Sequence, residues 1–284
     1  MALDYERLKN WRVDPVEHRY AVNDAILYAL GVGLGFDPCD ERELDFLYEA
    51  RLKVLPTLAT VLANPWGWLF KINVGATRAK HVLAEQGVTI HKLPPPAGTV
   101  VSELAVTSII DKGREKGALV YTERTLHDKA TGDLLCTLTN TMFCRADGGF
   151  GGPAGPVPTP QAIPERAPDE SCGLPSLRQS ALIYRLCGDR NPLHIDPAAA
   201  RKAGFDRPIL HGLCTFGMAG HALLKTYCAY DPGRLRAITG RFSRPVFPGE
   251  TVTTDLWQDG NAVLFRARVG DRVVLDNGRA EISP

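Results

Sequence analysis

The second half of this chain repeats the first half in a weak but ordered way. Ala25–Tyr28 (AILY) and Ala181–Tyr184 (ALIY) are near copies that lie 156 residues apart. Three further pairs follow in the same order, at offsets of 155, 152 and 144 residues: 55–60 with 210–215, 96–100 with 248–252, and 118–121 with 262–265. One such match would be noise, but four in order indicate a duplication with small deletions. We therefore expect two copies of one folding unit.

A stretch dense in glycine and proline separates the two copies. The sequence GGFGGPAGPVPTP at 148–160 is unsuited to a helix or a ladder strand and is typical of a linker. We expect an N-terminal repeat at 1–147, a linker at 148–160 and a C-terminal repeat at 161–284. A length of 284 residues agrees with two domains of ordinary size.

Both halves show the same predicted order of elements. A short helix comes first: in the N-terminal half Asn23 is the expected N-cap, the helix covers 24–30, and Gly31 ends it. Alternating runs rich in β-branched residues follow, at 99–111, 117–127 and 134–144, and again at 251–258, 262–269 and 273–282. A helix followed by antiparallel strands predicts an α+β fold in which the helix packs on one sheet face.

The two halves differ in the length of a second helix. Apolar positions at helical spacing run from Gly212 to about Tyr227 in the C-terminal half. The matching stretch in the first half meets Asn64 and Pro65 after about ten residues, and proline cannot continue a helix interior. A shortened first helix would leave an open apolar cleft lined by the N-terminal half.

Charge and composition exclude several classes of protein. Lys and Arg number 33 against 32 Asp and Glu, so a general footprint for nucleic acid or an anionic membrane is missing. The longest apolar stretch, 55–70, is interrupted by prolines and a glycine, and the first ten residues lack the apolar core of a secretory signal. The chain also ends without a Ser-Lys-Leu peroxisomal signal. The prediction is a soluble cytoplasmic protein without a nucleic-acid or membrane partner.

Familiar cofactor and metal motifs are missing from the sequence. The seven cysteines are odd in number and none form a Cys-x-x-Cys pair, which predicts reduced thiols that serve mostly as apolar fillers. The seven histidines include no His-x-x-x-His pair, and neither a dinucleotide nor a phosphate loop motif occurs. We expect no metal and no cofactor. Trp66 and Trp68 are expected in the core or at an interface.

The segment 184–197, YRLCGDRNPLHIDP, contains the strongest candidate for chemistry. It places Asp189, Asn191 and His194 within six residues on a turn after a short helix. An acid and an imidazole form a natural pair for gripping one water, because one accepts its proton while the other donates. From the spacing alone, an Asx turn at Asp189 with a surface histidine explains the segment equally well.

The internal repeat favours the functional interpretation. Aligning the two copies places Gly33, Gly35 and Pro38 opposite Asp189, Asn191 and His194. A fold that needed the acid and the histidine for packing would need them in both copies. The pattern therefore indicates one working site and one degenerate copy.

A second candidate is Gly212, which follows His211 at the start of the long predicted helix. A helix N-terminus offers free N–H groups and the positive end of the dipole, and glycine lets a ligand oxygen approach closely. Gly212 is therefore a candidate oxyanion hole for an enolate. The alternative is that this glycine merely permits a tight turn.

Several segments of the sequence resemble a known family. An aromatic residue followed by Gly-Asp-x-Asn-Pro-Leu-His, here Tyr184 and 188–194, is similar to the motif of the R-specific enoyl-CoA hydratase 2 or MaoC-like dehydratase family. The resemblance extends over nearly the whole chain, through 29–35, 92–98, 110–113, 148–152, 209–216, 241–242 and 245–249. It is greatest to the two-repeat form, as in the hydratase domain of peroxisomal multifunctional enzyme type 2.

The resemblance implies a double hot-dog fold, with a sheet wrapped around a helix in each repeat and catalysis in the C-terminal repeat only. It implies reversible hydration of a trans-2-enoyl-CoA to the (3R)-3-hydroxyacyl-CoA without a cofactor. Asp189 and His194 would activate the water, Asn191 would orient it or the histidine, and the Gly212 N–H would bind the thioester oxygen. A homodimer is expected.

The resemblance also implies contacts with the acyl-CoA substrate. These substrate or CoA contacts fall on Lys112, Arg190, Pro192, Leu193, Phe242, Leu83 and Ala84. The sequence departs from the family at Leu83 and Ala84, where a His-Gly pair is usual, and the nearby His81 has no clear role. The open cleft suggests medium or long acyl chains. The alternatives are a hot-dog thioesterase and a non-catalytic acyl-CoA-binding module.

Overall fold

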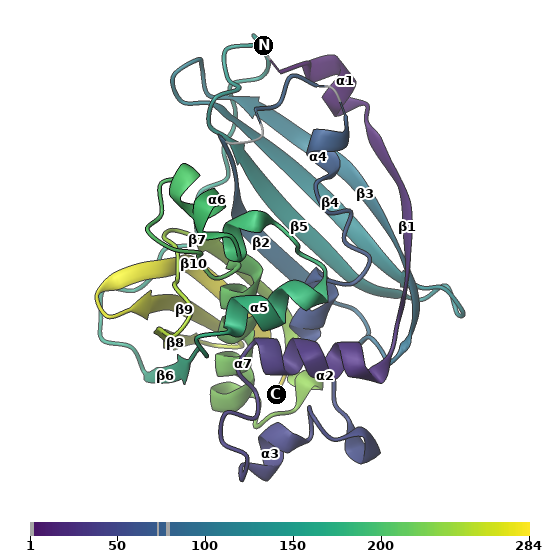
Figure 1. Ribbon diagram of the computed structural model, residues 1–284, viewed down its shortest axis with the longest axis vertical. Helices are drawn as coiled ribbons and strands as arrows, with labels where there is room; N and C mark the ends of the chain where they lie inside the picture. The colour runs from purple at the N-terminus through teal and green to yellow at the C-terminus, as the bar shows by residue number, and fades with distance from the viewer. Residues whose placement is uncertain (1–2, 73, 78–79) are drawn as a thin grey trace.

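A single ten-stranded antiparallel sheet organises the molecule in the computed structural model, which describes residues 3–72, 74–77 and 80–284 (Figure 1). The strands are β1 (Arg12–Tyr20), β2 (His81–Ile90), β3 (Gly98–Asp111), β4 (Ala118–Asp128), β5 (Leu134–Cys144), β6 (Glu170–Pro175), β7 (Leu235–Phe242), β8 (Thr251–Asp259), β9 (Ala262–Val269) and β10 (Arg272–Ile282). Their order across the sheet is β1-β3-β4-β5-β2-β7-β10-β9-β8-β6.

The five strands of each half follow the same order in the sheet, which shows that the two halves share one topology. Outward from the central pair β2–β7, the order is β5, β4, β3, β1 on one side and β10, β9, β8, β6 on the other. Each half therefore contributes five strands. The two halves join through antiparallel pairing of Glu85–Thr89 with Ala237–Arg241. Two hot-dog units that pair through one edge strand each, β2 and β7, make the predicted double hot-dog fold, and this arrangement confirms the duplication in the sequence.

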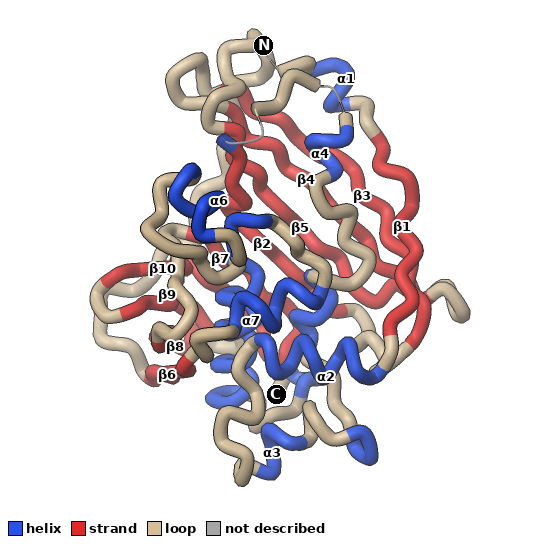
Figure 2. The backbone as a smooth tube through the Cα atoms, in the orientation of Figure 1, coloured by secondary structure: helices blue, strands red, loops and turns tan. Residues whose placement is uncertain are grey.

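Helices lie in front of part of the sheet in the view of Figure 2. The described α-helices are α1 (Tyr5–Lys9), α2 (Val22–Gly31), α3 (Glu41–Leu44), α4 (Trp68–Lys71), α5 (Ser180–Tyr184), α6 (Pro197–Lys202) and α7 (Gly212–Tyr227). Short 3-10 turns occur at η1 (Glu49–Arg51), η2 (Pro56–Thr60), η4 (Arg185–Cys187), η5 (Pro192–His194) and η6 (Pro232–Arg234). Helix α7 is the central helix of the C-terminal half.

Most expected elements form where the sequence placed them. The six expected strands agree with β3, β4, β5, β8, β9 and β10 to within a residue at each end, and α7 covers Gly212–Tyr227. The expected start of the first helix was wrong, because α2 begins at Val22 with Ala21 as its N-cap rather than at Asn23. The Asp24 carboxylate accepts a hydrogen bond from the Ala21 N–H, so an acid inside the first turn caps this helix. Gly31 is the last helical residue, and Val32 is the C-cap.

The shortened helix of the first half is confirmed, and a buried arginine explains how it ends. The counterpart of α7 is η2, a 3-10 turn of five residues. Arg124 of β4 is 2 % exposed, and its guanidinium donates to the carbonyls of Leu62 at 2.6 Å and Ala59 at 2.9 Å. These carbonyls would continue the hydrogen-bond ladder of a longer helix. The side chain of Arg124 satisfies them in place of the missing turns.

Two glycines let α7 pack closely against the N-terminal half. A Cβ at Gly217 would lie 2.5 Å from Val32 Cγ1, and one at Gly220 would lie 2.8 Å from Thr57 Cγ2. Both distances are shorter than real Cβ contacts, so larger side chains would force α7 away from α2 and η2. Glycine costs helix propensity here, but it permits the close packing of the two halves in one core.

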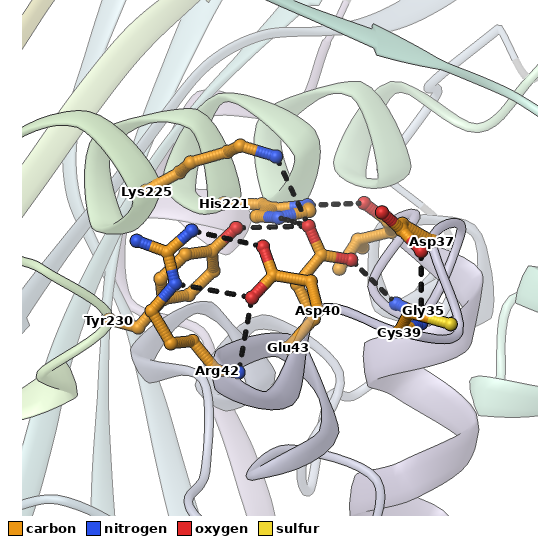
Figure 3. Close-up of polar contacts among 10 residues, drawn as sticks. Gly35, Asp37, Cys39, Asp40, Arg42, Glu43, His221, Lys225 and Tyr230 are labelled. Carbon is orange, nitrogen blue, oxygen red and sulfur yellow. Dashed lines mark hydrogen bonds and ion pairs between the residues drawn. The ribbon is translucent and has the colours of Figure 1, made fainter.

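A buried polar cluster joins the same two halves at the other end of α7 (Figure 3). The Glu43 carboxylate, on a residue 3 % exposed, accepts hydrogen bonds from Tyr230 Oη and the Gly35 N–H, each at 2.9 Å. Lys225 Nζ lies 3.3 Å and His221 Nε2 3.6 Å from the same carboxylate. Burial alone would favour protonation, but these partners outweigh it and lower the pKa of Glu43 to about 2.

Between β5 and β6 the chain forms neither helix nor strand, and this stretch contains the 148–160 segment. All seven cysteines are free, and Cys136, Cys144, Cys172, Cys214 and Cys228 are buried. In the described part of the chain, no helix combines the length and the apolar character needed to cross a bilayer.

Candidate active site

The loop between α5 and α6 carries the three candidate polar residues of the C-terminal repeat. It follows Gly188, which has φ of 123°, and continues through η5 into α6 (Figure 1). A backbone conformation with φ in this range is adopted readily only by glycine, so the turn that presents Asp189 depends on Gly188. The equivalent helix of the first half, α2, packs against α5, with the rings of Tyr28 and Tyr184 5.9 Å apart.

Asp189 forms the Asx turn that the spacing allowed as an alternative. One carboxylate oxygen accepts from the Asn191 N–H at 3.1 Å. The second oxygen has no partner among the described residues and remains available to a water or a substrate proton. The Asx turn and the catalytic interpretation are therefore compatible, because the turn uses one oxygen and orients the other.

Asn191 shapes the loop through its side-chain carbonyl. This oxygen accepts from the Leu193 N–H at 3.1 Å and so caps the 3-10 turn η5. Asn191 itself is exposed. Its amide N–H₂ group has no described protein partner and is the part of the side chain left for the role expected from the sequence.

His194 is a buried imidazole with a defined tautomer. It is 7 % exposed, and its Nδ1 lies 2.9 Å from the carbonyl oxygen of Ile209. A carbonyl only accepts, so Nδ1 carries the proton and Nε2 presents a lone pair. Burial lowers the pKa of His194, although the charge of Asp189 and the Ile209 carbonyl act in the opposite direction. The ring is therefore neutral near pH 7 and suited to accept a proton.

The structure brings the acid and two imidazoles together. A carboxylate oxygen of Asp189, a ring nitrogen of His194 and a ring nitrogen of His211 lie within 4.8 Å of one another. A water that bonds to two groups at ordinary hydrogen-bond length spans about 4–5 Å between them. Asp189 and His194 are therefore close enough to share one water.

Gly212, the candidate oxyanion hole, is the first residue of the 16-residue helix α7, as expected from the sequence. The N–H groups of Cys214 and Thr215 donate to the carbonyl of His211, whereas that of Gly212 has no described acceptor. Gly212 is exposed, and a Cβ added there would lie 3.3 Å from the ring of Phe242. The position that a side chain would occupy at Gly212 therefore faces the ring of Phe242.

Strand pairing places two further expected substrate residues near this point. Arg241 pairs with Glu85 across the central strands, which brings Phe242 of β7 next to Ala84 and Leu83 of β2. The ladder between β2 and β5 shifts register between Leu83 and Glu85, so Ala84 lies at a bulge. Phe242 and Leu83 both pack against the main core, on the helix-covered face.

Lys112 lies at the ends of the strands rather than beside Leu83. Its Nζ is 5.7 Å from the ring centroid of Phe143, and Arg145 approaches the same ring at 5.7 Å. Phe143 pairs with Val82, so it lies on the opposite face of the sheet from Leu83. Lys112 also lines a surface hollow of about 500 Å³ with Lys116 and five neighbours: Asp111, Gly113, Gly152, Ala154 and Val157.

The remaining expected contacts belong to the catalytic loop itself. Arg190 and Pro192 are exposed, and Leu193 is half-buried. No described acidic side chain pairs with Arg190. Its guanidinium is therefore free to meet an anionic ligand.

His81 has a structural partner. Its Nε2 lies 2.6 Å from Asp147 Oδ2, and both side chains are almost fully buried. Asp147 also accepts from the Thr77 hydroxyl at 2.6 Å and from the Thr77 N–H. His81 thus fixes the loop after β5 to the start of β2, and this contact explains a residue whose role the sequence left open.

Two groups of side chains have the residue types of a metal site: Asp189, His194 and His211, and separately His81, Cys144 and Asp147. The rings of His194 and His211 are stacked, with centroids 3.8 Å apart and planes 27° from parallel. Because imidazole lone pairs lie in the ring plane, stacked rings direct them side by side rather than toward one ion. In the second group, burial raises the pKa of the Cys144 thiol to about 12, whereas a metal ligand must be a thiolate.

Sequence reasoning missed the roles of two residues near this loop. His211 was noted only as the neighbour of Gly212, yet it stacks on His194. Trp66 is half-buried against the main core, and its indole Nε1 would lie 2.8 Å from a Cβ at Gly188. The sequence contained a signal for His211, an unexplained histidine beside a functional glycine, but none for the contact of Trp66.

Comparison with known proteins agrees with this fold. Residues 159–277 match the model of the MaoC-like domain, and residues 18–146 match that of the MFE-2 hydratase 2 N-terminal domain. An enoyl-CoA hydratase of Mycobacterium tuberculosis is 39 % identical over 270 residues, covering 93 % of this chain and 92 % of that protein. Mouse peroxisomal multifunctional enzyme type 2 is 36 % identical over 93 % of this chain, which spans 37 % of that protein.

Solved structures show the same architecture. A MaoC-like dehydratase from Phytophthora capsici superposes with a TM-score of 0.85 at 30 % identity, covering 98 % of this chain and 97 % of that one. The protein is thus a double hot-dog enzyme of the hydro-lyase class. The chain belongs to the MaoC-like dehydratase family, in its two-repeat hydratase 2 form.

Proposed function

We propose that this enzyme catalyses the reversible hydration of trans-2-enoyl-CoA to (3R)-3-hydroxyacyl-CoA. The observation that supports it best is the cluster of Asp189 and a neutral His194 beside the unpaired N–H of Gly212. Water activation and enolate stabilisation are the two tasks of this reaction, and each has a group of the right chemistry. The names of the relatives, which include enoyl-CoA hydratases, support the substrate class.

In the proposed reaction, a water lies between Asp189 and His194 and loses one proton to this pair. Its oxygen forms a bond to C3 while the C2–C3 π electrons move toward the thioester carbonyl. The Gly212 N–H then donates to the resulting enolate oxygen. When the carbonyl reforms, C2 takes the proton from the pair, so water has been added and nothing else is consumed. The thioester supplies the necessary acidity, and this scheme requires no cofactor.

The CoA portion is proposed to leave the site along Phe242, Leu83 and Ala84 and to pass the ends of the strands. His81 and Ala118 each pair with Cys144 there, so the starts of β2 and β4 and the end of β5 lie at one rim. Lys112 and Arg145 stand at that rim with positive charge available for the phosphates. Lys112→Glu and Arg145→Glu should each raise KM about tenfold with little change in kcat. An unchanged KM in both variants would contradict this route.

Medium or long acyl chains are the proposed substrates. This part of the proposal rests on the difference between the five-residue η2 and the 16-residue α7, since the missing turns lie in the non-catalytic half. Comparing turnover on four-carbon and ten-carbon enoyl-CoA is the direct test. A strict preference for the four-carbon substrate would refute it.

The experiment for the reaction itself is the ultraviolet loss of the conjugated enoyl thioester, with chiral analysis of the product. Crotonyl-CoA and trans-2-decenoyl-CoA should both be hydrated to the R alcohol, and Asp189→Asn and His194→Gln should each abolish turnover. Release of free CoA without hydration would instead identify a thioesterase. Binding without turnover would identify an acyl-CoA-binding module.

We further propose a homodimer located in the cytoplasm, as the sequence and the family resemblance predict. Sedimentation should give twice the mass of one chain. Fractionation of the source cells should recover the enzyme with cytoplasmic markers. Several relatives carry the word peroxisomal in their names, so an organelle fraction is the informative comparison.

A further inference from the structure

His211 is a buried imidazole that touches the acid, the base and the oxyanion hole of the proposed site. It is 1 % exposed and immediately precedes Gly212. One face of its ring stacks on His194 at 3.8 Å, and the ring of Tyr184 packs against it at 5.1 Å. Its Nε2 lies 3.2 Å from the main-chain carbonyl of Asp189.

These contacts define the chemical state of His211. Because the Asp189 carbonyl can only accept, Nε2 carries the proton and Nδ1 is the unprotonated nitrogen. Nδ1 is fully buried and has no hydrogen-bond partner in the part of the chain that the structure describes. Burial and the neighbouring His194 lower the pKa of His211 to about 3. The ring of His211 is therefore neutral near pH 7.

A neutral ring at this position has consequences that no charged side chain would share. A second imidazolium 3.8 Å from His194 would repel the charge that His194 gains when it accepts a proton. A flat neutral ring covers one face of His194, excludes water from it and limits rotation about its side-chain bonds. The Nε2–H donor meanwhile holds the main chain of Asp189, on the other side of the proposed water.

We infer that His211 is a positioning residue for hydration: it sets the separation between Asp189 and His194 and locks both to the N-terminus of α7. This inference rests on the proposed function. His211 and Gly212 share a peptide bond, so the water-activating pair and the enolate-binding N–H become one rigid unit. His211 touches neither water nor substrate and acts through its neighbours.

Two substitutions separate the two contacts of His211. His211→Phe keeps a flat ring against His194 but loses the N–H that donates to Asp189. His211→Gln keeps an amide donor but loses the stacked ring. Misplacement of a reacting group by about 1 Å can cost about 100-fold in rate. We expect kcat to fall about 10- to 100-fold in each variant, with KM changed less than threefold.

The pH profile distinguishes positioning from a general loss of stability. In His211→Gln, water reaches the uncovered face of His194, so the acid limb of kcat/KM should move to higher pH. In His211→Phe the face stays covered and the limb should stay where it is. His221→Gln is the matched control, because it removes another buried imidazole from the same helix, and it should leave both kcat and the limb unchanged.

A measurement without substrate separates failure of this inference from failure of the proposed reaction. Imidazole NMR of the unaltered protein should show His211 as the Nε2–H tautomer without titration above pH 5. It should also show a His194 pKa that rises in His211→Gln. A His211 that titrates near pH 6.5 would overturn the inference whether or not enoyl-CoA is hydrated. Folded variants of both types that keep kcat within threefold would overturn it as well.

Discussion

His194 and Glu43 show how single side chains in this fold respond oppositely to burial. The imidazole of His194 loses its charge because few groups compensate for lost solvent. The carboxylate of Glu43 keeps its charge because it accepts hydrogen bonds from Tyr230 and the Gly35 N–H and lies beside Lys225 and His221. Burial therefore leaves His194 neutral in the proposed site, whereas Glu43 in the core is ionised at pH 7. The partners decide which occurs.

The Asp189 charge should be measurable through His194. The carboxylate raises the pKa of His194 and partly offsets burial. Asp189→Asn removes the charge but keeps an oxygen for the Asx turn, so the pKa of His194 should fall further by NMR titration. Asp196→Asn, in the same loop, is the control and should leave it unchanged. A His194 pKa that stays constant in Asp189→Asn would mean that the two side chains are not close neighbours in solution.

Gly212 should tolerate no side chain. A Cβ there meets Phe242 at 3.3 Å, so Gly212→Ala should displace either the ring or the helix N-terminus and lower kcat about 10- to 100-fold. Gly173→Ala on β6 is the matched control, since its Cβ would make only ordinary contacts at 3.8 Å. Adding Phe242→Leu to Gly212→Ala should recover part of the loss. Full activity in Gly212→Ala would argue against an oxyanion hole at this N–H.

At the scale of elements, the two copies of the central helix have diverged. In the C-terminal half, α7 presents its free N–H groups to the site and packs through Gly217 and Gly220. In the N-terminal half only η2 remains, and the guanidinium of Arg124 replaces the missing turns. One duplicated element therefore provides the N-terminus of the proposed oxyanion hole, while the other supports its packing.

Arg124 should be essential for stability rather than activity. Arg124→Met leaves the carbonyls of Leu62 and Ala59 buried and unpaired, and each such group costs about 1–3 kcal/mol. We expect the free energy of unfolding to fall by about 2–4 kcal/mol in urea titrations. Arg236→Met, at an exposed site on β7, should change it by less than about 0.5 kcal/mol. Equal effects of the two substitutions would show that the buried hydrogen bonds contribute nothing.

At the scale of the whole molecule, the two halves are joined at three levels. Strands β2 and β7 pair across the sheet, α7 packs on α2 and η2 in the core, and the Glu43 cluster links α3 to the end of α7. Of these three contacts between the halves, only the Glu43 cluster contains a buried charged side chain. The acid sensitivity of the assembly should therefore depend on Glu43.

The expected pH dependence follows from the sign of the Glu43 shift. Its pKa is about 2 in the folded protein, below the ordinary value of 4.5. The stability that it contributes is present above pH 4.5 and is lost as the pH falls from 4.5 toward 2. Urea unfolding between pH 7 and pH 3 should show this loss, and Glu43→Gln should flatten it while lowering stability at pH 7. Glu41→Gln, exposed in the same helix, should retain the dependence of the unaltered protein.

The sequence alone determined the duplication, six of the ten strands, the extent of α7 and the residues of the proposed site. Each of these has a local signal: alternation, helical spacing, a Gly-Pro stretch, or a motif that one copy lost. Strands β1, β2, β6 and β7 were not predicted, although β2 and β7 join the halves. The residues of these strands are selected by packing against their partner strands, and those partners are distant in sequence.

Only the tertiary structure decided how the site is held. The stack of His211 on His194, the contact of Trp66 with Gly188 and the Glu43 cluster each join residues from different segments of the chain. Such contacts depend on the register of distant strands and on how closely helices pack, which periodicity within a short window does not encode. The sequence therefore specified which groups could do the chemistry. Packing determined their separation, tautomers and charge.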